Sequence, residues 1–491
     1  MSSSGIASIS PVGLPSNLQY TQLPSVPDSV NSYSVSVAPS GLTSVSGSAI
    51  NTAVFVANSA GLVNQLFNPQ NIDFAIPAGM NENVFMDTQQ TVLSFKMKIV
   101  VSTASTVAGG ELKLISSASS FYDSLTLTSN NIPIDQVYNY NLLFNQLLSS
   151  SVNLAERYGQ GSVSMGCDTD TYSGVDLPHG ATGTYWFNFS IPLLSIIGLN
   201  TAGTSNKLFP IGSVGALNLR LTTSNLLPFA SYCTGITTQP VFTVSLESFN
   251  LDMKYIDIGD IAGNMLRQTL PNGMYYIKSS TYIGANASVP TGSFGNVSIP
   301  LQIRNSSMKS LYIQFGIATS AKCPNGYYDA VNPNLISLQL NIGGKKKPNR
   351  PLNPSLEPAN SFVNFMEAWG KTSTLDGSGT VYRGAYGATL NAVTNSDTLI
   401  VVPSQGTRDK SQINTADDDI IVHFPNAHFI GFDTERISGS LFSGTDTRFS
   451  PPYLECNIGT TLTDNVTCYA FALLDCVIKI DPQQKTCEVL V

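Results

Sequence analysis

Charged residues are scarce in this sequence. Lys, Arg, Asp and Glu make up 11% of the 491 residues, against roughly a quarter in an ordinary soluble domain. The hydrophobic fraction is ordinary at 42%, so Ser, Thr, Asn and Gly take the place of the missing charge. Such a surface favours a subunit whose faces are covered by neighbours, although a secreted β protein can share this composition.

Positive charge is missing from the N-terminal segment. No Lys or Arg precedes Lys96, and Asp28 is the only charged residue before Asp73. A basic arm that neutralises phosphates is therefore absent. We expect no specific nucleic-acid binding by this segment.

Targeting and membrane signals are also lacking. The start, Met1 to Gly5, has neither the positive charge nor the apolar core of a signal peptide. The longest apolar candidate, 191–199, is interrupted by Pro192, Ser195 and Gly198, whereas a transmembrane helix needs about 20 apolar residues. We expect a chain that is neither conventionally secreted nor membrane-spanning.

Residues that carry catalysis or bind metals are few. The three histidines are His179, His423 and His428, and the sequence has no H-E-x-x-H, G-x-S-x-G or phosphate-loop motif. Asp417, Asp418 and Asp419 fit no calcium loop and are more typical of a solvated turn. Lys345, Lys346 and Lys347, with Arg350 close by, form the only basic cluster and indicate an exposed turn between a strand and a helix. The sequence predicts no catalytic, cofactor-binding or metal residues, and therefore no enzyme.

Cysteine is present but shows no pairing pattern. The seven cysteines include no C-x-x-C pair, and an odd number leaves at least one unpaired. We expect reduced thiols. The residues are Cys167, Cys233, Cys323, Cys456, Cys468, Cys476 and Cys487.

One pattern occurs twice along the chain: an amphipathic strand, a Pro-containing turn and an aromatic helix. The first copy comprises 121–128, 131–135 and a helix over 137–148, with Asp135 expected at the helix N-terminus. The second comprises 335–342, 348–354 and a helix over 361–369. Period-2 strands with a helix at the same offset predict one β fold used in tandem.

The strands show clear alternation. Leu93, Phe95, Met97 and Ile99 alternate with polar residues, as in a half-buried strand. Within 242–258 the apolar parity changes between Leu246 and Phe249. One extra residue in a strand exchanges its faces, so this change predicts a β-bulge.

The domain organisation follows from these signals. We predict an extended or disordered N-terminal arm over 1–52, which orders on contact with neighbouring subunits. A first domain over 53–258, a linker over 259–273 and a second domain over 274–491 follow. Many short antiparallel strands without βαβ crossovers predict an all-β chain of two tandem jelly-roll sandwiches, each with a short inserted helix.

A resemblance to a known family rests on specific segments. These are 125–148, 189–194 with 208–212 and 217–222, and the C-terminal strand 469–475. They resemble the double jelly-roll major capsid proteins of double-stranded DNA viruses, and especially those of virophages and polinton-like viruses. The resemblance covers 53–491 and leaves the arm outside.

The resemblance implies a structural function. A chain of this family would form a homotrimer of pseudo-hexameric outline that tiles an icosahedral shell in the virion around a double-stranded DNA genome. Its partners would be neighbouring trimers, penton proteins, minor capsid or cement proteins and, through the arm, an internal membrane. The long loops 149–182 and 372–396 would cap the outer face or clasp neighbours, and no cofactor is implied.

Other classes remain open. A two-domain β-sandwich adhesin or carbohydrate-binding protein shares the composition, but it predicts export and an exposed aromatic platform, whereas Trp186 and Trp369 are predicted to lie in the core. A glycan-active enzyme needs paired carboxylates in a cleft, which the sequence alone cannot pair. A minor capsid or spike protein is disfavoured by the tandem duplication.

Overall fold

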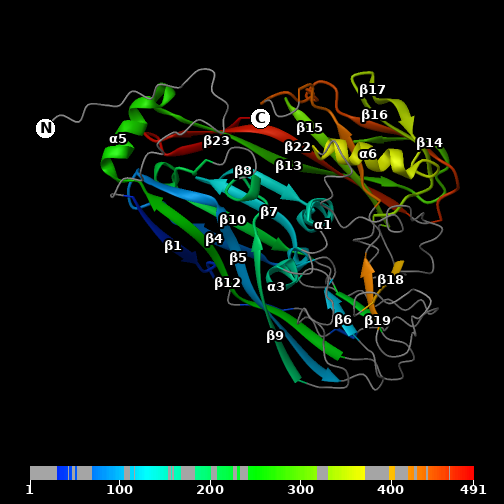
Figure 1. Cartoon of the computed structure of the whole chain (residues 1–491), viewed down its shortest axis with the longest axis horizontal. Coiled ribbons are helices and arrows are strands. Elements are labelled where there is room, and N and C mark those ends of the chain that lie inside the picture. Colours follow the sequence, from blue (N-terminus) through cyan, green and yellow to red (C-terminus); the bar gives the residue numbers. More distant parts are fainter. Residues whose placement is uncertain are drawn as a thin grey trace, which may run out of the picture.

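The structure is a computed structural model dominated by antiparallel β-sheets (Figure 1). It describes residues 30–41, 44–46, 50–51, 69–103, 111–114, 117–152, 156, 160–166, 183–200, 207–224, 229–232, 241–317, 330–370, 398–403, 419–424, 428–437, 441–463 and 465–490. No helix in these ranges is long and apolar enough to span a membrane.

The first half of the chain builds two facing sheets, one of six strands and one of four. One sheet has the order β1-β12-β5-β9 and the other has the order β4-β10-β7-β8, with antiparallel neighbours throughout. The strands are β1 (Asn31–Val37), β4 (Asn71–Ile76), β5 (Val84–Thr103), β7 (Tyr122–Ser129), β8 (Ile132–Tyr138), β9 (Gly183–Pro192), β10 (Leu217–Thr223) and β12 (Val241–Asp257).

The second half repeats this arrangement strand for strand. Its sheets have the orders β13-β22-β15-β20 and β14-β21-β16-β17, again antiparallel. Taken in chain order, each strand therefore has a topological equivalent in the first half: β13 corresponds to β1, β17 to β8 and β22 to β12. The strands are β13 (Tyr275–Val289), β14 (Gly295–Pro300), β15 (Met308–Ile317), β16 (Leu335–Ile342), β17 (Lys345–Leu352), β20 (Ile430–Asp433), β21 (Tyr453–Ile458) and β22 (Val466–Asp481).

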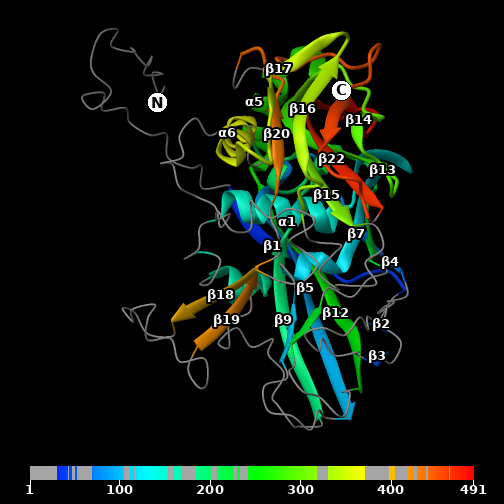
Figure 2. The same ribbon diagram turned by 90° about the vertical axis from the view of Figure 1, so that its right-hand side faces the viewer.

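Two facing antiparallel sheets whose eight main strands follow this order form a jelly roll, so the predicted tandem jelly-roll fold is confirmed. Figure 2 shows the strands of the second jelly roll above those of the first, whose long strands β5, β9 and β12 extend downward.

A helix follows the fifth strand of each jelly roll. These helices are α1 (Tyr140–Ser151) and α6 (Pro358–Ala368). The predicted helix over 137–148 begins too early, because Val137 still belongs to β8. Both predicted Pro-containing turns are wrong: they lie in edge strands β8 and β17, where Pro is tolerated since it need not donate to a ladder.

Shorter elements complete the described chain. The strands β2 (Ser44–Ser46) and β3 (Ile50–Asn51) pair with β12, and β23 (Thr486–Leu490) pairs with β22. The pairs β6 (Glu111–Leu114) with β11 (Phe229–Tyr232) and β18 (Thr398–Pro403) with β19 (Asp419–Phe424) form two-stranded sheets. The remaining helices are α3 (Ser162–Met165), α5 (Gly259–Thr269) and the 3-10 turns η2 (Ala118–Phe121), η4 (Ile211–Ser213) and η5 (Pro271–Gly273).

The core lies between the facing sheets. Leu93, Phe95, Met97 and Ile99 on β5 are all buried, as their alternation predicts. The ring of Phe95 lies 5.6–6.3 Å from four other buried aromatic rings. Burial of large apolar side chains is the main force holding such sandwiches together. The four rings belong to Phe121, Tyr122, Phe189 and Phe249.

The predicted bulge in β12 is confirmed. The register with β5 shifts between Glu247 and Asn250, and Ser248 has a φ of 55°. Leu246 before the shift and Phe249 after it are both buried. The extra residue therefore keeps apolar side chains inward on both sides of the bend.

The predicted arm is partly wrong. Residues 31–37 form β1, which pairs with β12 of the same chain, because Tyr33, Val35 and Val37 alternate with exposed polar residues. Ordering of this part needs no neighbouring subunit, and the sheet begins well before residue 53. Residues 1–29 lie outside the described residues.

The predicted linker contains a helix. α5 and η5 occupy almost all of 259–273, and Leu266 packs against the core while Asp260 lies in the first turn. We propose 31–257 and 275–490 as the two domains, with α5 and η5 between them.

Candidate interaction surfaces

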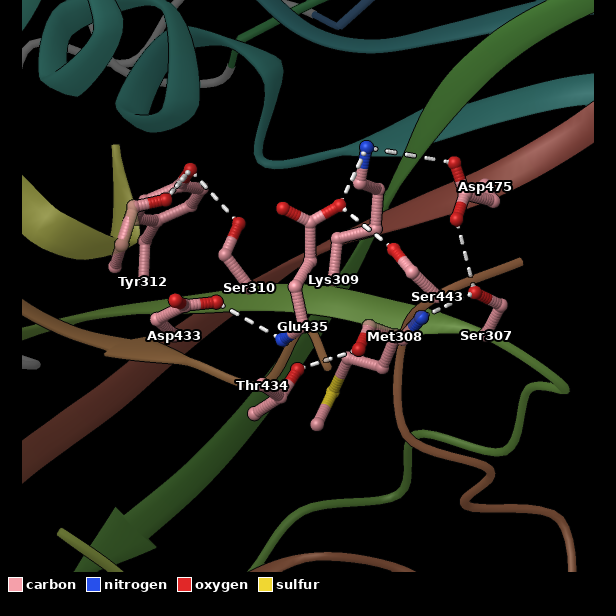
Figure 3. Close-up of polar contacts among 12 residues, drawn as sticks. Ser307, Met308, Lys309, Ser310, Tyr312, Asp433, Thr434, Glu435, Ser443 and Asp475 are labelled. Atoms are coloured by element: carbon pink, nitrogen blue, oxygen red, sulfur yellow. Dashed lines mark hydrogen bonds and ion pairs between the residues drawn. The ribbon is translucent and has the colours of Figure 1, made fainter. Parts of the chain in front are cut away.

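A buried polar cluster fastens a long connection of the second jelly roll to its sheet (Figure 3). Lys309, at the start of β15, places its Nζ 2.8 Å from Oε1 of Glu435 and 3.6 Å from Oδ1 of Asp475. Glu435 follows β20, and Asp475 lies in β22 with a side chain that is 1% exposed. A charge this deeply buried is stable only when it is paired.

Hydroxyl groups complete the polar cluster. Ser307 donates from Oγ to Oδ2 of Asp475 over 2.9 Å and accepts from the amide of Gly444 over 3.0 Å. Ser443 donates to Oε1 of Glu435 over 3.0 Å. The Ser307 hydroxyl donates its proton to a carboxylate and not to an imidazole, as an activated serine nucleophile would. We therefore interpret the cluster as structural and call it a staple, because it fastens the connection after β20 to β15 and β22. This cluster has one signal in the sequence, namely charged residues inside apolar strands of a charge-poor chain, and it is not among the predicted sites.

A second buried carboxylate joins the two jelly rolls. Asp135 on β8 accepts hydrogen bonds from Oγ1 of Thr281 on β13 (2.7 Å), from Oγ of Ser195 (2.8 Å) and from the amide of Ile196 (2.9 Å). Burial raises the pKa of Asp135, and these hydrogen bonds oppose that rise. The prediction that Asp135 caps a helix is wrong. It anchors the seam, by which we mean the contact of β8 with β13.

Among the histidines and the acidic run, the structure describes the side chain of His428 alone. His428 is buried, and desolvation lowers its pKa to about 4. His179, Asp417 and Asp418 lie outside the described residues, and only the backbone of His423 and Asp419 is described, in β19. Among the described side chains, no group of three or more His, Cys, Asp or Glu residues gathers to hold a metal ion.

The basic cluster lies on a strand. Instead of forming an exposed turn, Lys345 to Leu352 form β17, the edge strand of its sheet. Lys346 pairs with Glu455 (2.5 Å) and Arg350 pairs with Glu357 (2.7 Å). Burial is the main cause of a lowered pKa at Lys347. An edge strand rich in Lys and Pro resists uncontrolled strand pairing.

Four of the described cysteines are buried and form no disulfide, as expected for reduced thiols; they are Cys456, Cys468, Cys476 and Cys487. Cys167, Cys233 and Cys323 lie outside the described side chains.

Several large apolar side chains are exposed, and two groups of them lie far apart in the fold. One is the loop before β21, where Leu441, Phe442 and Phe449 are exposed. The other is α5, where Ile261 and Met265, four residues apart, lie on one exposed face. Exposed apolar side chains that cluster in this way mark interaction sites more often than solitary ones do.

The two tryptophans differ in position. Trp369 packs against the core as predicted and stacks on Phe365. The prediction for Trp186 is wrong: it is 51% exposed, with Nζ of Lys98 5.0 Å from its ring centroid. It shares the outward parity of Asn188 on β9, while Phe189 points inward.

Comparisons with known proteins find similarity in structure only. No family model matches the sequence, and no curated protein sequence matches it. The mavirus major capsid protein superposes with a TM-score of 0.52 at 10% identity, covering 100% of this chain and 96% of that chain. A chain of the Sputnik virophage particle superposes with a TM-score of 0.52 at 10% identity, covering 99% and 93%. The chain therefore has the double jelly-roll fold of virophage capsid proteins.

Proposed function

We propose that this chain is a major capsid protein and that three copies form a capsomer of pseudo-hexameric outline, which tiles an icosahedral shell around a double-stranded DNA genome. The observation that carries this proposal is the strand order, which is the same in both jelly rolls. Three chains supply six jelly rolls of the same topology. In a closed ring of six, every jelly roll contacts two neighbours and no interface is left open.

The composition and the polar groups support a structural role. With 11% charged residues, the surface suits broad polar contacts completed by bridging water. The buried carboxylates Asp135 and Asp475 are engaged by donors within the chain, so they serve the fold. We therefore assign no reaction, catalytic residue, cofactor or metal to this chain.

The further partners that we propose follow from the shell. Neighbouring trimers, penton proteins and minor capsid or cement proteins would meet the trimer at its rim. The N-terminal segment before β1 would run beneath the shell toward neighbouring capsomers or an internal membrane. Its lack of Lys and Arg argues against tight contact with the genome. The place of action would be the virion.

One observation favours a second candidate. Trp186 is exposed on β9, and an exposed aromatic ring is what a β-sandwich adhesin or carbohydrate-binding protein presents to a sugar. A single ring covered on one side by Lys98 is a small platform, so we rank this function second.

The deciding experiment is the mass of the purified chain by light scattering, followed by negative-stain imaging of the same peak. Trimers that appear as hexagonal plates, or whole shells, support the capsid function. A stable elongated monomer rules it out, and glycan-array binding by wild type against Trp186→Ala then tests the adhesin.

A further inference from the structure

The seam inside the chain shows how one jelly roll meets the next. Edge strand β8 of the first jelly roll lies against β13, the edge strand of the second. Thr281 donates to Asp135 within this contact, and Nδ2 of Asn139 donates to Oδ1 of Asn286 over 3.0 Å. The contact is made by side chains, since β8 and β13 share no backbone ladder.

Within the described part of the chain, the equivalents of these two strands make no such contact with each other. β17 is equivalent to β8, and β1 is equivalent to β13. Among the described residues β17 pairs only with β16 and β1 pairs only with β12, each at the edge of its sheet. Figure 1 shows β17 at one end of the long axis and β1 with α5 at the other. One chain therefore presents the equivalent of β8 at one end and the equivalent of β13 at the opposite end.

We propose that β17 and the adjoining loop at Phe449 of one copy dock against β1 and α5 of the next copy, repeating the seam between chains. This inference rests on the proposed function and names the surfaces that close the trimer. Such a contact joins two different surfaces, and three copies close it into a ring.

The turn contacts locate the meeting point more closely. Before β8, the Nδ2 of Asn130 donates to the carbonyl of Lys485 over 3.2 Å, and Lys485 comes four residues after the end of β22 at Asp481. The equivalent turn before β17 is at Gly343. β12 is equivalent to β22, so the equivalent of Lys485 is Ile261, four residues after the end of β12 at Asp257.

An exposed apolar side chain lies beside the first of these positions and at the second. A Cβ at Gly343 would lie 3.7 Å from the Cβ of Ser450, which places Phe449 beside this turn. Phe449 is 91% exposed and Ile261 is 77% exposed. Covering both removes apolar surface from water, which the isolated chain cannot do.

Charge is complementary across the same contact. β17 carries four cations, Lys345, Lys346, Lys347 and Arg350, within six residues. Lys346 pairs with Glu455 and Arg350 pairs with Glu357, so four positive charges meet two negative ones and this surface stays positive. Carboxylates gather at the start of α5: Asn83 donates to Asp260 (2.7 Å), Asn81 donates to Asp257 (3.4 Å) and Arg267 pairs with Glu82 (3.5 Å). Three carboxylates against one guanidinium leave this surface negative, which favours a basic partner.

Crosslinking tests the assignment directly. In a background with Cys167, Cys233 and Cys323 replaced by Ser, we would compare Ile261→Cys, Phe449→Cys and the double variant, each treated with a bis-maleimide. Light scattering before treatment reports whether trimers form. The double variant is expected to give covalent dimers and trimers on a denaturing gel, and each single variant is expected to stay monomeric there.

Phe294→Cys with Phe449→Cys is the matched control. Phe294 is exposed but precedes β14 at Gly295, which pairs with Ile458, at the end of the sheet away from Phe449. If light scattering shows trimers but the double variant Ile261→Cys with Phe449→Cys gives no crosslinks, the inference is overturned and the proposed function stands. Crosslinks in either single variant also overturn it, because they mean that like surfaces meet. Monomers throughout overturn both.

Discussion

Thr281 on β13 donates a hydrogen bond of 2.7 Å to Asp135 on β8, and the two residues are 146 positions apart in the chain. The contact is buried and joins the two jelly rolls. The apolar core is also continuous between them, since Tyr275 and Ile277 of β13 belong to the same cluster as the core of the first jelly roll. The two jelly rolls are therefore expected to unfold together.

Asp135→Asn should weaken the seam. The amide nitrogen is a donor, and it would replace either Oδ2, which accepts from Ser195 and Ile196, or Oδ1, which accepts from Thr281. In either position it would face groups that donate to the carboxylate. Leaving buried donors without an acceptor costs about 1–3 kcal/mol, which would lower the thermal unfolding midpoint. The matched control is Asp73→Asn, at an exposed pair with Arg220, where we expect little change. Equal midpoints in both variants would contradict a role for Asp135 in the seam.

Lys309→Met should lower the free energy of unfolding more than Asp135→Asn does. It leaves Glu435 and the almost fully buried Asp475 without their cation. Loss of one partner from a buried ion pair costs about 3–5 kcal/mol. Denaturant unfolding would measure this loss, with Lys346→Met as the control because its pair with Glu455 is on the surface. If the control loses as much stability as Lys309→Met, the polar cluster is not the staple that we describe.

Acid should destabilise the fold through His428. Its pKa of about 4 lies below the ordinary value of 6.5, so unfolding takes up a proton between these values. The stability contribution is full above pH 6.5, declines as the pH falls toward 4 and reaches a loss of about 3 kcal/mol. Unfolding midpoints from pH 7 to 4 would be compared for wild type and His428→Gln. The midpoint of His428→Gln should fall less than that of wild type as the pH is lowered. If the two midpoints fall in parallel with pH, His428 is excluded as the cause. The raised pKa of Asp135 acts in the opposite direction but is common to both proteins.

Removal of residues 1–41 should expose the edge of β12. The deletion removes β1 and its seven-residue register with β12, so an unpaired edge is open to aggregation. We expect a midpoint several degrees lower, since a loss of ~1 kcal/mol corresponds to about 2–4 °C for a domain of this size. Deletion of residues 1–29 keeps β1 and should leave the midpoint unchanged. Two deletions with the same midpoint would show that β1 adds nothing to the sheet.

The parts of the fold that could be predicted are those with a local periodic signal. Leu93 to Ile99 alternates because one face is buried, and the phase change before Phe249 marks a real bulge. The edge strands β8 and β17 were missed because an edge tolerates Pro and charge, which erase the alternation. α5 was missed because Gly259 and Gly263 were interpreted as linker residues.

The interaction surfaces were harder to predict for a different reason. Asp135 meets Thr281, and Lys309 meets Glu435 and Asp475, across sequence separations that no local pattern encodes. Trp186 was misplaced because its neighbours Tyr185 and Phe187 suggested a core strand, whereas strict alternation places it with Asn188 on the outside. Only the pairing of strands decides which face is inward.

The seam also affects how assembly depends on concentration. In a ring of three chains, half of the contacts between jelly rolls lie within a chain, and the partner strands β8 and β13 are joined by a continuous polypeptide. Those contacts form at a high effective concentration that dilution cannot change. Formation of the proposed capsomer would then require the encounter of three molecules, where six separate jelly rolls would require six. Tandem fusion would therefore let the proposed ring close at protein concentrations too low for six independent units.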